Sequence, residues 1–183
     1  MSSPRFVHLR LHSEYSITDG LTRLDDAVAQ AMADGMPALA LTDLANLFGM
    51  VKFYSAARKK GIKPILGADV WVSADASAEK HARILLLVQD RAGYHRLCEL
   101  LTRAYRNPIQ RGKIVLRREW FLELGTDGLI ALSGAQSGDV GQALMNDAWA
   151  AALSLARAWG ALFPGRYYLE IQRNCRPDVE LHL

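Results

Sequence analysis

Cysteine is scarce in this sequence: among its 183 residues, only Cys98 and Cys175 carry a thiol. These two positions form neither a CxxC pair nor a zinc-finger spacing, which excludes a disulfide-rich secreted scaffold and a zinc finger. The first twelve residues lack the apolar segment of a secretory signal peptide. We therefore expect a cytoplasmic protein with both cysteines as free thiols.

Long hydrophobic runs are also absent. The longest clear apolar run, residues 84–88, is far shorter than the ~18 residues needed to cross a bilayer, and it suits a buried strand. No membrane partner is expected. The glycine patterns GxGxxG after the first strand and GxxxxGK(S/T) do not occur either, so a nucleotide-binding sheet of either kind has no support.

The overall composition is that of a globular protein. Hydrophobic residues make up 50% of the chain and charged residues 22%. The formal net charge is +3 and the isoelectric point is about 9.0. This mildly basic balance permits contact with nucleic acid without implying it.

Strand-like and helix-like segments alternate along the chain. Strands are predicted at residues 6–12, 37–42, 64–72, 83–88, 128–133 and 167–172. Helices are predicted from Thr22 to Gly35 and at residues 46–60, 94–106, 118–124, 139–145 and 149–162. This alternation is typical of α/β proteins with parallel strands, arranged as an open doubly wound sheet or as a β/α barrel. In both architectures, functional side chains gather at the carboxyl ends of the strands.

The helix predicted at residues 46–60 is amphipathic. Its expected apolar face consists of Leu47, Met50, Val51 and Tyr54. Its last turn is basic, which suits the negative end of the helix dipole, and Gly61 follows as a stop.

The first predicted strand contains the string HLRLH at residues 8–12. Because side chains alternate along a strand, His8, Arg10 and His12 would share one face. Two histidines on one face suggest a metal site, whereas an arginine between them has no lone pair to donate. His8 lies nearer the strand start and is expected to be packed or hydrogen-bonded rather than a ligand.

Polar side chains also lie at the ends of other predicted strands. Asp19 follows the first strand, Asp43 follows the second, Asp69 lies in the third and Glu170 lies in the last. Carboxylates and an imidazole that converge on one edge form a metal-site composition. The alternative is that these are ordinary polar residues at the starts of loops.

Several longer strings are more specific than any periodicity. They are FVHLRLHSEYSITDG, TDLANLFGMVKFY, GIKPILGADVWV, LIALSGAQSGDVG and RYYLEIQRNCRPD. In these strings the sequence resembles the PHP (polymerase and histidinol phosphatase) domain at the amino terminus of the bacterial replicative DNA polymerase III alpha subunit. The resemblance implies a distorted β/α barrel. Residues 1–183 would be its amino-terminal part, incomplete because the remaining strands and the polymerase domains would lie beyond Leu183.

The resemblance also implies positions for a metal site, because metal-binding members of the family hydrolyse phosphoesters with a cluster at the strand ends. The corresponding positions here are Arg10, His12, Asp19, Asp43, Leu44, Asp69, Arg83 and Gly134, with His81 as a rival to Arg83. The departures from the family pattern are Arg10, Leu44 and Arg83 in place of histidines, Asp69 in place of a glutamate, and Gly134 in place of a cysteine.

These departures predict that the metal chemistry has been lost. The guanidinium of Arg10 stays protonated and, at ~4 Å and an effective dielectric constant of about 20, would repel a divalent ion by about 8 kcal/mol. His12, Asp19 and Asp69 are instead expected to pair with Arg10. We therefore expect no catalytic residue, no metal and no cofactor in this chain. The alternative is a single zinc or magnesium ion held by His12, Asp19 and Asp69.

The function implied by the resemblance is that of an inactive scaffold. Such a domain would support the polymerase core, dock the proofreading exonuclease subunit and contact other polymerase III subunits. DNA synthesis, its magnesium ions and the contact with DNA would belong to the parent subunit, a DNA-directed DNA polymerase. The alternative is a metal-dependent phosphoesterase or 3′–5′ exonuclease that retains a residual metal site.

A basic cluster offers a further hypothesis. It consists of Arg103, Arg106, Arg111, Lys113, Arg117 and Arg118. These side chains could bind DNA phosphates, contact the rest of the polymerase, or form a solvated face. Aromatic residues are thinly interleaved, with only Tyr105 and Trp120 nearby, so no stacking platform for single strands is expected.

Overall fold

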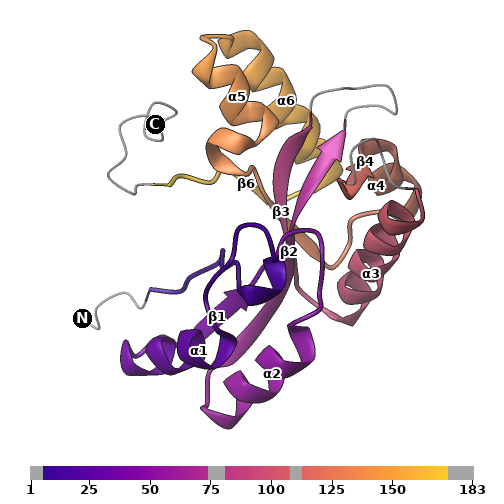
Figure 1. The fold of residues 1–183 in the computed structure, drawn as a ribbon. Helices are drawn as coiled ribbons and strands as arrows, with labels where there is room; N and C mark the ends of the chain where they lie inside the picture. Colours follow the sequence, from indigo (N-terminus) through magenta and orange to yellow (C-terminus); the bar gives the residue numbers. More distant parts are fainter. Residues whose placement is uncertain (1–5, 74–80, 108–112, 173–183) are drawn as a thin grey trace. The chain divides into compact units, whose positions relative to one another are not determined.

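The computed structural model describes residues 6–73, 81–107 and 113–172 (Figure 1). The chain divides into two compact units, Met1–Asp69 and Val70–Leu183. Strand β2, Lys63–Ser73, begins in the first unit and ends in the second. In the described part of the chain, no helix is long and apolar enough to span a membrane.

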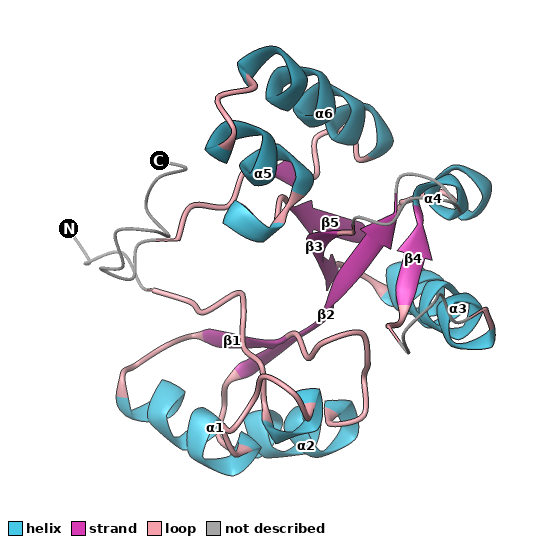
Figure 2. Cartoon of the chain, turned by 45° about the horizontal axis from the view of Figure 1, so that its top comes forward, coloured by secondary structure: helices cyan, strands magenta, loops and turns pink. Residues whose placement is uncertain are grey.

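The first unit is built on one parallel strand pair. It contains the 3-10 helix η1 (Glu14–Ser16), helix α1 (Leu24–Ala33), strand β1 (Ala38–Leu41), helix α2 (Met50–Lys59) and the first part of β2. Strand β1 pairs with β2 in parallel, from Ala38 opposite Lys63 to Leu41 opposite Leu66. Both helices pack on this pair (Figure 2), and Leu24, Val28, Leu39 and Phe53 are buried between them.

Two expectations for the first unit are wrong. Residues 6–12 form no regular strand, although Ala40 N–H donates to His8 O at 3.0 Å. At the next contact the Thr42 N–H donates to Leu11 O at 3.0 Å, but the Leu11 N–H donates to the Thr42 hydroxyl at 2.9 Å, so a side chain replaces one of the two backbone partners of a regular ladder. Helix α2 begins only at Met50.

The buried face of α2 also differs from the expected one. It carries Phe53 and Ala57, both fully buried, whereas Val51 is 68% exposed and Tyr54 is 47% exposed. Phe53 packs in the core cluster with Leu24 of α1 and Leu39 of β1, which leaves Val51 and Tyr54 on the outer side.

The second unit contains the remaining elements. They are β3 (Ala82–Val88), α3 (Arg91–Arg106), β4 (Val115–Arg117), α4 (Arg118–Leu124), β5 (Leu129–Leu132), the 3-10 helix η3 (Ala135–Ser137), α5 (Asp139–Met145), α6 (Trp149–Leu162) and β6 (Tyr167–Tyr168). The strand order is β1–β2–β3–β5–β6, and β4 pairs with β2. The expected α/β class is confirmed, and the described strands do not close into a ring.

The sheet contains both parallel and antiparallel strand pairs. Strands β2 and β4, and β5 and β6, run in parallel, whereas β3 and β5 are antiparallel. The hydrophobic pattern of a buried strand reads the same in both directions, so the sequence could not show this reversal. The three-residue strand β4 was not predicted either.

An aromatic cluster forms part of the core of the second unit. The ring centroids of Phe121 and Trp159 are 5.9 Å apart, and those of Phe121 and Phe163 are 5.7 Å apart. The indole N–H of Trp159 donates to Asp139 Oδ2 at 2.8 Å, and Asp139 Oδ1 also accepts the backbone N–H of Val140. Asp139 thus joins the start of α5 to the buried face of α6.

We expect Asp139→Ala to lower the free energy of unfolding by about 2 kcal/mol, because the buried indole N–H loses its acceptor. Urea denaturation followed by circular dichroism measures the change. Asp127→Ala is the matched control: its side chain is 86% exposed beside Arg166, and its loss should cost less than about 0.5 kcal/mol. Equal effects of the two substitutions would contradict the assigned role of Asp139.

Candidate functional site

Four charged or titratable side chains form a cluster in the first unit. Its central member is Asp69, which is fully buried in β2. The guanidinium of Arg10 contacts Asp69 Oδ2, and His12 Nε2 lies 3.0 Å from the same oxygen. On its other side, His12 Nδ1 lies 3.0 Å from Asp19 Oδ1. The sequence predicted that these residues would meet, and we refer to the four as the Asp69 cluster.

Electrostatics favours the protonated form of His12. Burial disfavours the charge and lowers the pKa of His12, but hydrogen bonds and charge attraction from Asp69 and Asp19 outweigh burial and raise this pKa above its ordinary value. With His12 protonated, two positive side chains face two carboxylates. The Asp69 cluster is then balanced in charge without any metal ion.

The raised pKa predicts a pH-dependent stability. The stabilisation from protonated His12 is fully present below its unfolded-state pKa of about 6.5 and is lost as the pH rises through the higher folded-state pKa. The free energy of unfolding should therefore fall with increasing pH across this interval, and His12→Gln should remove that part of the slope. Urea titrations at a series of pH values test this. His95→Gln, on the exposed face of α3, should keep the slope, and a slope that His12→Gln leaves unchanged would contradict the assignment.

Asp43 does not join the Asp69 cluster but accepts hydrogen bonds from a nearby turn. It is 1% exposed, and its carboxylate accepts the Ser13 N–H at 2.6 Å, the Ser13 hydroxyl at 2.9 Å and the Ser16 hydroxyl at 2.8 Å. The next residue after this turn, Ile17, has a φ of 64°, a strained value for a β-branched residue. Asp43 thus holds the turn at residues 13–16, a role that sequence reasoning missed because its partners lie about thirty positions away.

Leu44 lies directly beside Asp69. The two residues form an isolated parallel bridge, in which Ala45 N–H donates to Asp69 O at 2.7 Å. The Leu44 side chain is half-buried and offers no donor atom to a metal. A hydrocarbon side chain therefore stands where the family resemblance predicted a histidine position.

Arg83 and Gly134 belong to the second unit. Gly134 has a φ of +78°, and a Cβ there would stand 2.4 Å from the backbone oxygen of Arg83. No side chain, and hence no cysteine ligand, fits at this position without a backbone shift. The Arg83 guanidinium lies 4.7 Å from the centroid of the Trp71 ring. The rival position, His81, has a pKa lowered by burial and by the charge of Lys113.

The basic cluster is partly neutralised within the second unit. Arg103 pairs with Glu99 at 2.9 Å and with Glu123 at 2.6 Å, and Arg117 lies 3.5 Å from Glu119. Three of its cations stack on indole rings: Lys113 on Trp71, Arg117 on Trp120 and Arg118 on Trp159. Arg106 is exposed at the end of α3, and Arg111 lies outside the described residues.

Comparison with known proteins assigns the chain to a family. The family model for the PHP domain matches residues 8–174. The chain belongs to the PHP domain family. It is 47% identical to the DNA polymerase III subunit alpha of Pseudomonas fluorescens over 178 residues, which cover 97% of this chain and 15% of that protein. With the same subunit of Escherichia coli (strain K12) it shares 44% identity over 183 residues, or 16% of that protein.

A solved structure shows a more distant likeness. An amidohydrolase from Chromobacterium violaceum, solved with bound sulfate and no metal, is 26% identical with a TM-score of 0.43; the match covers 57% of this PHP chain and 34% of that one. In the comparison with alpha subunits, by contrast, the PHP chain covers only 15% and 16% of the length of the two proteins, or about a sixth.

The side chains of the Asp69 cluster do not fit the metal that the PHP family implies. Among the described residues, no three His, Cys, Asp or Glu side chains gather in an arrangement that could hold a metal ion. Arg10 contacts the same Asp69 oxygen that His12 approaches, and a guanidinium there would repel a divalent cation. Leu44 supplies no donor. The arrangement suits a structural ion-pair network rather than a metal centre.

Proposed function

We propose that this PHP chain is the amino-terminal part of the PHP domain of a replicative DNA polymerase alpha subunit, and that this part acts as a scaffold without phosphoesterase activity. The observation that carries the proposal is the contact of Arg10 with the buried carboxylate of Asp69. It puts a fixed positive charge where the metal-binding relatives would need a cation. Nucleotide transfer and its magnesium ions would belong to the polymerase domains of the longer protein.

The partners follow from the similarity to alpha subunits. The PHP part would support the polymerase core and dock a separate proofreading exonuclease subunit, together with other polymerase III subunits, in the cytoplasm. Contact with DNA would be made through the parent subunit. A domain without its own hydrolytic site is consistent with a proofreading activity supplied by a partner.

Two assays on the 183-residue chain test this proposal. Hydrolysis of a 3′-labelled DNA strand and of a small phosphate ester, with added zinc, manganese or magnesium, should not exceed the rate measured without protein. Binding of the exonuclease subunit from the same replicative polymerase should be detectable by calorimetry. Metal-dependent hydrolysis that His12→Gln abolishes would overturn the inactive-scaffold proposal, and failure to bind would remove the docking role alone.

A further inference from the structure

Four basic side chains gather around the turn that joins α2 to β2 in the first unit. We call them the α2–β2 cations: Arg58, Lys59, Lys60 and Lys63. All four are exposed, and no acidic residue occurs between positions 58 and 63. The turn precedes the paired part of β2, whereas Asp69 bridges to Leu44 beyond the carboxyl end of β1. The cations are therefore separate from the Asp69 cluster.

The backbone of this turn is fixed by its own hydrogen bonds. Ile62 N–H donates to Ala57 O at 2.9 Å. Gly61, with a φ of +75°, donates its N–H to Arg58 O at 3.2 Å. These two bonds form a Schellman motif, and the side chains of Ala57 and Ile62 are buried in the core of the unit. The cations thus project from a rigid frame.

The α2–β2 cations are not neutralised by neighbouring carboxylates. Within residues 6–73, 81–107 and 113–172, no carboxylate pairs with any of the four. Lys52, on the same helix, differs, because its ammonium lies 3.4 Å from Glu14 and 3.7 Å from Asp25. Backbone N–H groups already satisfy the last carbonyls of α2, so no basic side chain is needed as a cap. Attraction to the helix dipole falls off within the last turn and does not account for Lys63, which belongs to β2.

The basic cluster identified from the sequence is in a different state. Arg103 pairs with two glutamates, and Arg117 lies 3.5 Å from a third. Lys113 and Arg118 stack on indole rings. Of the two groups, the α2–β2 cations therefore carry the positive charge that no neighbouring acidic group offsets, and they attract a polyanion more strongly.

We propose that the α2–β2 cations bind the phosphate backbone of double-stranded DNA without reading its sequence. Lysine and arginine side chains donate to phosphate oxygens, and such contacts carry no base information. A Cβ at Gly61 would meet no atom within 4 Å, so the middle of the turn is open to an approaching backbone. The choice of DNA among polyanions with a phosphate backbone rests on the proposed function.

The surroundings of the turn favour a duplex over other polyanions. A protein partner would need an apolar centre, and residues 58–61 and Lys63 offer none, because the apolar Ile62 is buried. Tyr54 is the exposed aromatic residue of α2, and one ring is not a stacking platform for unpaired bases.

The release of counterions gives this contact a measurable signature. Four neutralised phosphates predict a slope of about −3.6 for the logarithm of the binding constant against the logarithm of the salt concentration. Each lysine replaced by alanine should make the slope shallower by about 0.9. Duplexes of different sequence should bind alike, since the bases are not contacted.

Fluorescence anisotropy of a short labelled DNA duplex tests the contact, with the 183-residue chain in EDTA at salt concentrations of about 50 to 200 mM. Lys59→Ala with Lys60→Ala should weaken binding at least about tenfold at the lowest salt and reduce the slope by about 1.8. Lys63→Ala, which lies outside the helix, should reduce the slope by about 0.9. Because these side chains are exposed, the variants should fold, which circular dichroism verifies.

Lys52→Ala with Arg103→Ala is the matched control. It removes the same amount of positive charge, but from side chains that are paired with carboxylates, so binding should change less than about twofold. The proposal fails if the duplex does not bind at the lowest salt, or if the two double variants lose binding equally. It also fails if poly-glutamate of equal charge competes as well as unlabelled duplex, which would identify an acidic protein segment as the partner. Neither phosphoesterase activity nor binding of the exonuclease subunit enters these measurements, so failure here is distinguishable from failure of the scaffold proposal.

Discussion

Arg10→Met is expected to lower the free energy of unfolding by about 3–5 kcal/mol, the cost of leaving a buried charge without its partner. Asp69 has no exposed surface, and Arg10 is in direct contact with its carboxylate. Methionine keeps much of the side-chain volume, so the loss reports charge rather than a cavity. His12 alone would then face both Asp69 and Asp19.

A double substitution separates the charge effect from packing. Because replacing both members of a buried pair is often nearly neutral, Arg10→Met with Asp69→Leu should recover most of the lost stability. Lys52→Met is the matched control: its ammonium lies 3.4 Å from Glu14 with 45% of the side chain exposed, so its loss should cost less than about 1 kcal/mol. Urea denaturation gives all values, and an Arg10→Met protein as stable as the unsubstituted chain would refute the ion-pair account.

Asp43→Ala is expected to cost about 3–5 kcal/mol, because charge-assisted hydrogen bonds contribute about 1.5–3 kcal/mol each and the buried donors would lose their acceptor. The donors are the Ser13 N–H and hydroxyl and the Ser16 hydroxyl. All of this polar network is buried, and it fixes the turn before Ile17, whose backbone is strained. Release of the turn would allow that strain to relax.

The same substitution distinguishes a structural carboxylate from a metal ligand. If Asp43 holds the turn, the loss is the same with and without EDTA, since no metal contributes to the stability. Asp34→Ala is the matched control. It removes an exposed carboxylate that accepts a hydrogen bond from Gln30, and it should change the free energy of unfolding by less than about 0.5 kcal/mol. A destabilisation by Asp43→Ala that disappears in EDTA would show that Asp43 acts through a bound ion.

The helices of the second unit were largely readable from the sequence. The intervals predicted at residues 118–124, 139–145 and 149–162 coincide with α4, α5 and α6. Helix formation depends on local spacing of apolar residues and on local end signals, which a sequence displays directly. Strand pairing depends on distant residues, so the direction of β5 relative to β3 could not be read in the same way.

The first segment shows where local patterns are insufficient. The alternation in HLRLH predicted a strand at residues 6–12. In the structure, however, the N–H groups of Leu11 and Ser13 donate hydrogen bonds to the side chains of Thr42 and Asp43. These side-chain acceptors come from the end of β1, about thirty positions along the chain. A pattern of period two carries no information about such partners.

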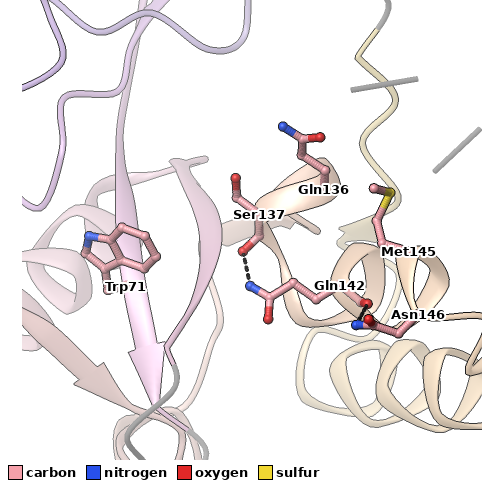
Figure 3. Close-up of a pocket in the computed structure, with 6 residues that line it drawn as sticks. All are labelled: Trp71, Gln136, Ser137, Gln142, Met145 and Asn146. Atoms are coloured by element: carbon pink, nitrogen blue, oxygen red, sulfur yellow. Dashed lines mark hydrogen bonds between the residues drawn. The ribbon is translucent and has the colours of Figure 1, made fainter. Parts of the chain in front are cut away.

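The candidate site was predictable in composition and only partly in geometry. The resemblance of the strings around Arg10, Asp19 and Asp69 to the PHP family placed these residues together, and the structure brings them into contact with His12. The resemblance did not reveal that the Asp43 carboxylate accepts hydrogen bonds from the hydroxyl groups of Ser13 and Ser16. A pocket lined by Trp71, Gln136, Gln142 and Asn146 (Figure 3) was also missed, because nothing in the local sequence shows that these distant residues line a common cavity.

The measurement that tests the central claim most directly is the content of divalent metal per chain. Elemental analysis would be made after purification without chelator and dialysis against zinc, manganese and magnesium, on the unsubstituted chain and on Arg10→His with Leu44→His. We predict that the unsubstituted chain holds far less than one ion, and that the double variant gains metal because two donors replace a cation and a hydrocarbon. One tightly held ion per unsubstituted chain, lost on His12→Gln, would contradict the conclusion that an ion pair has replaced the metal.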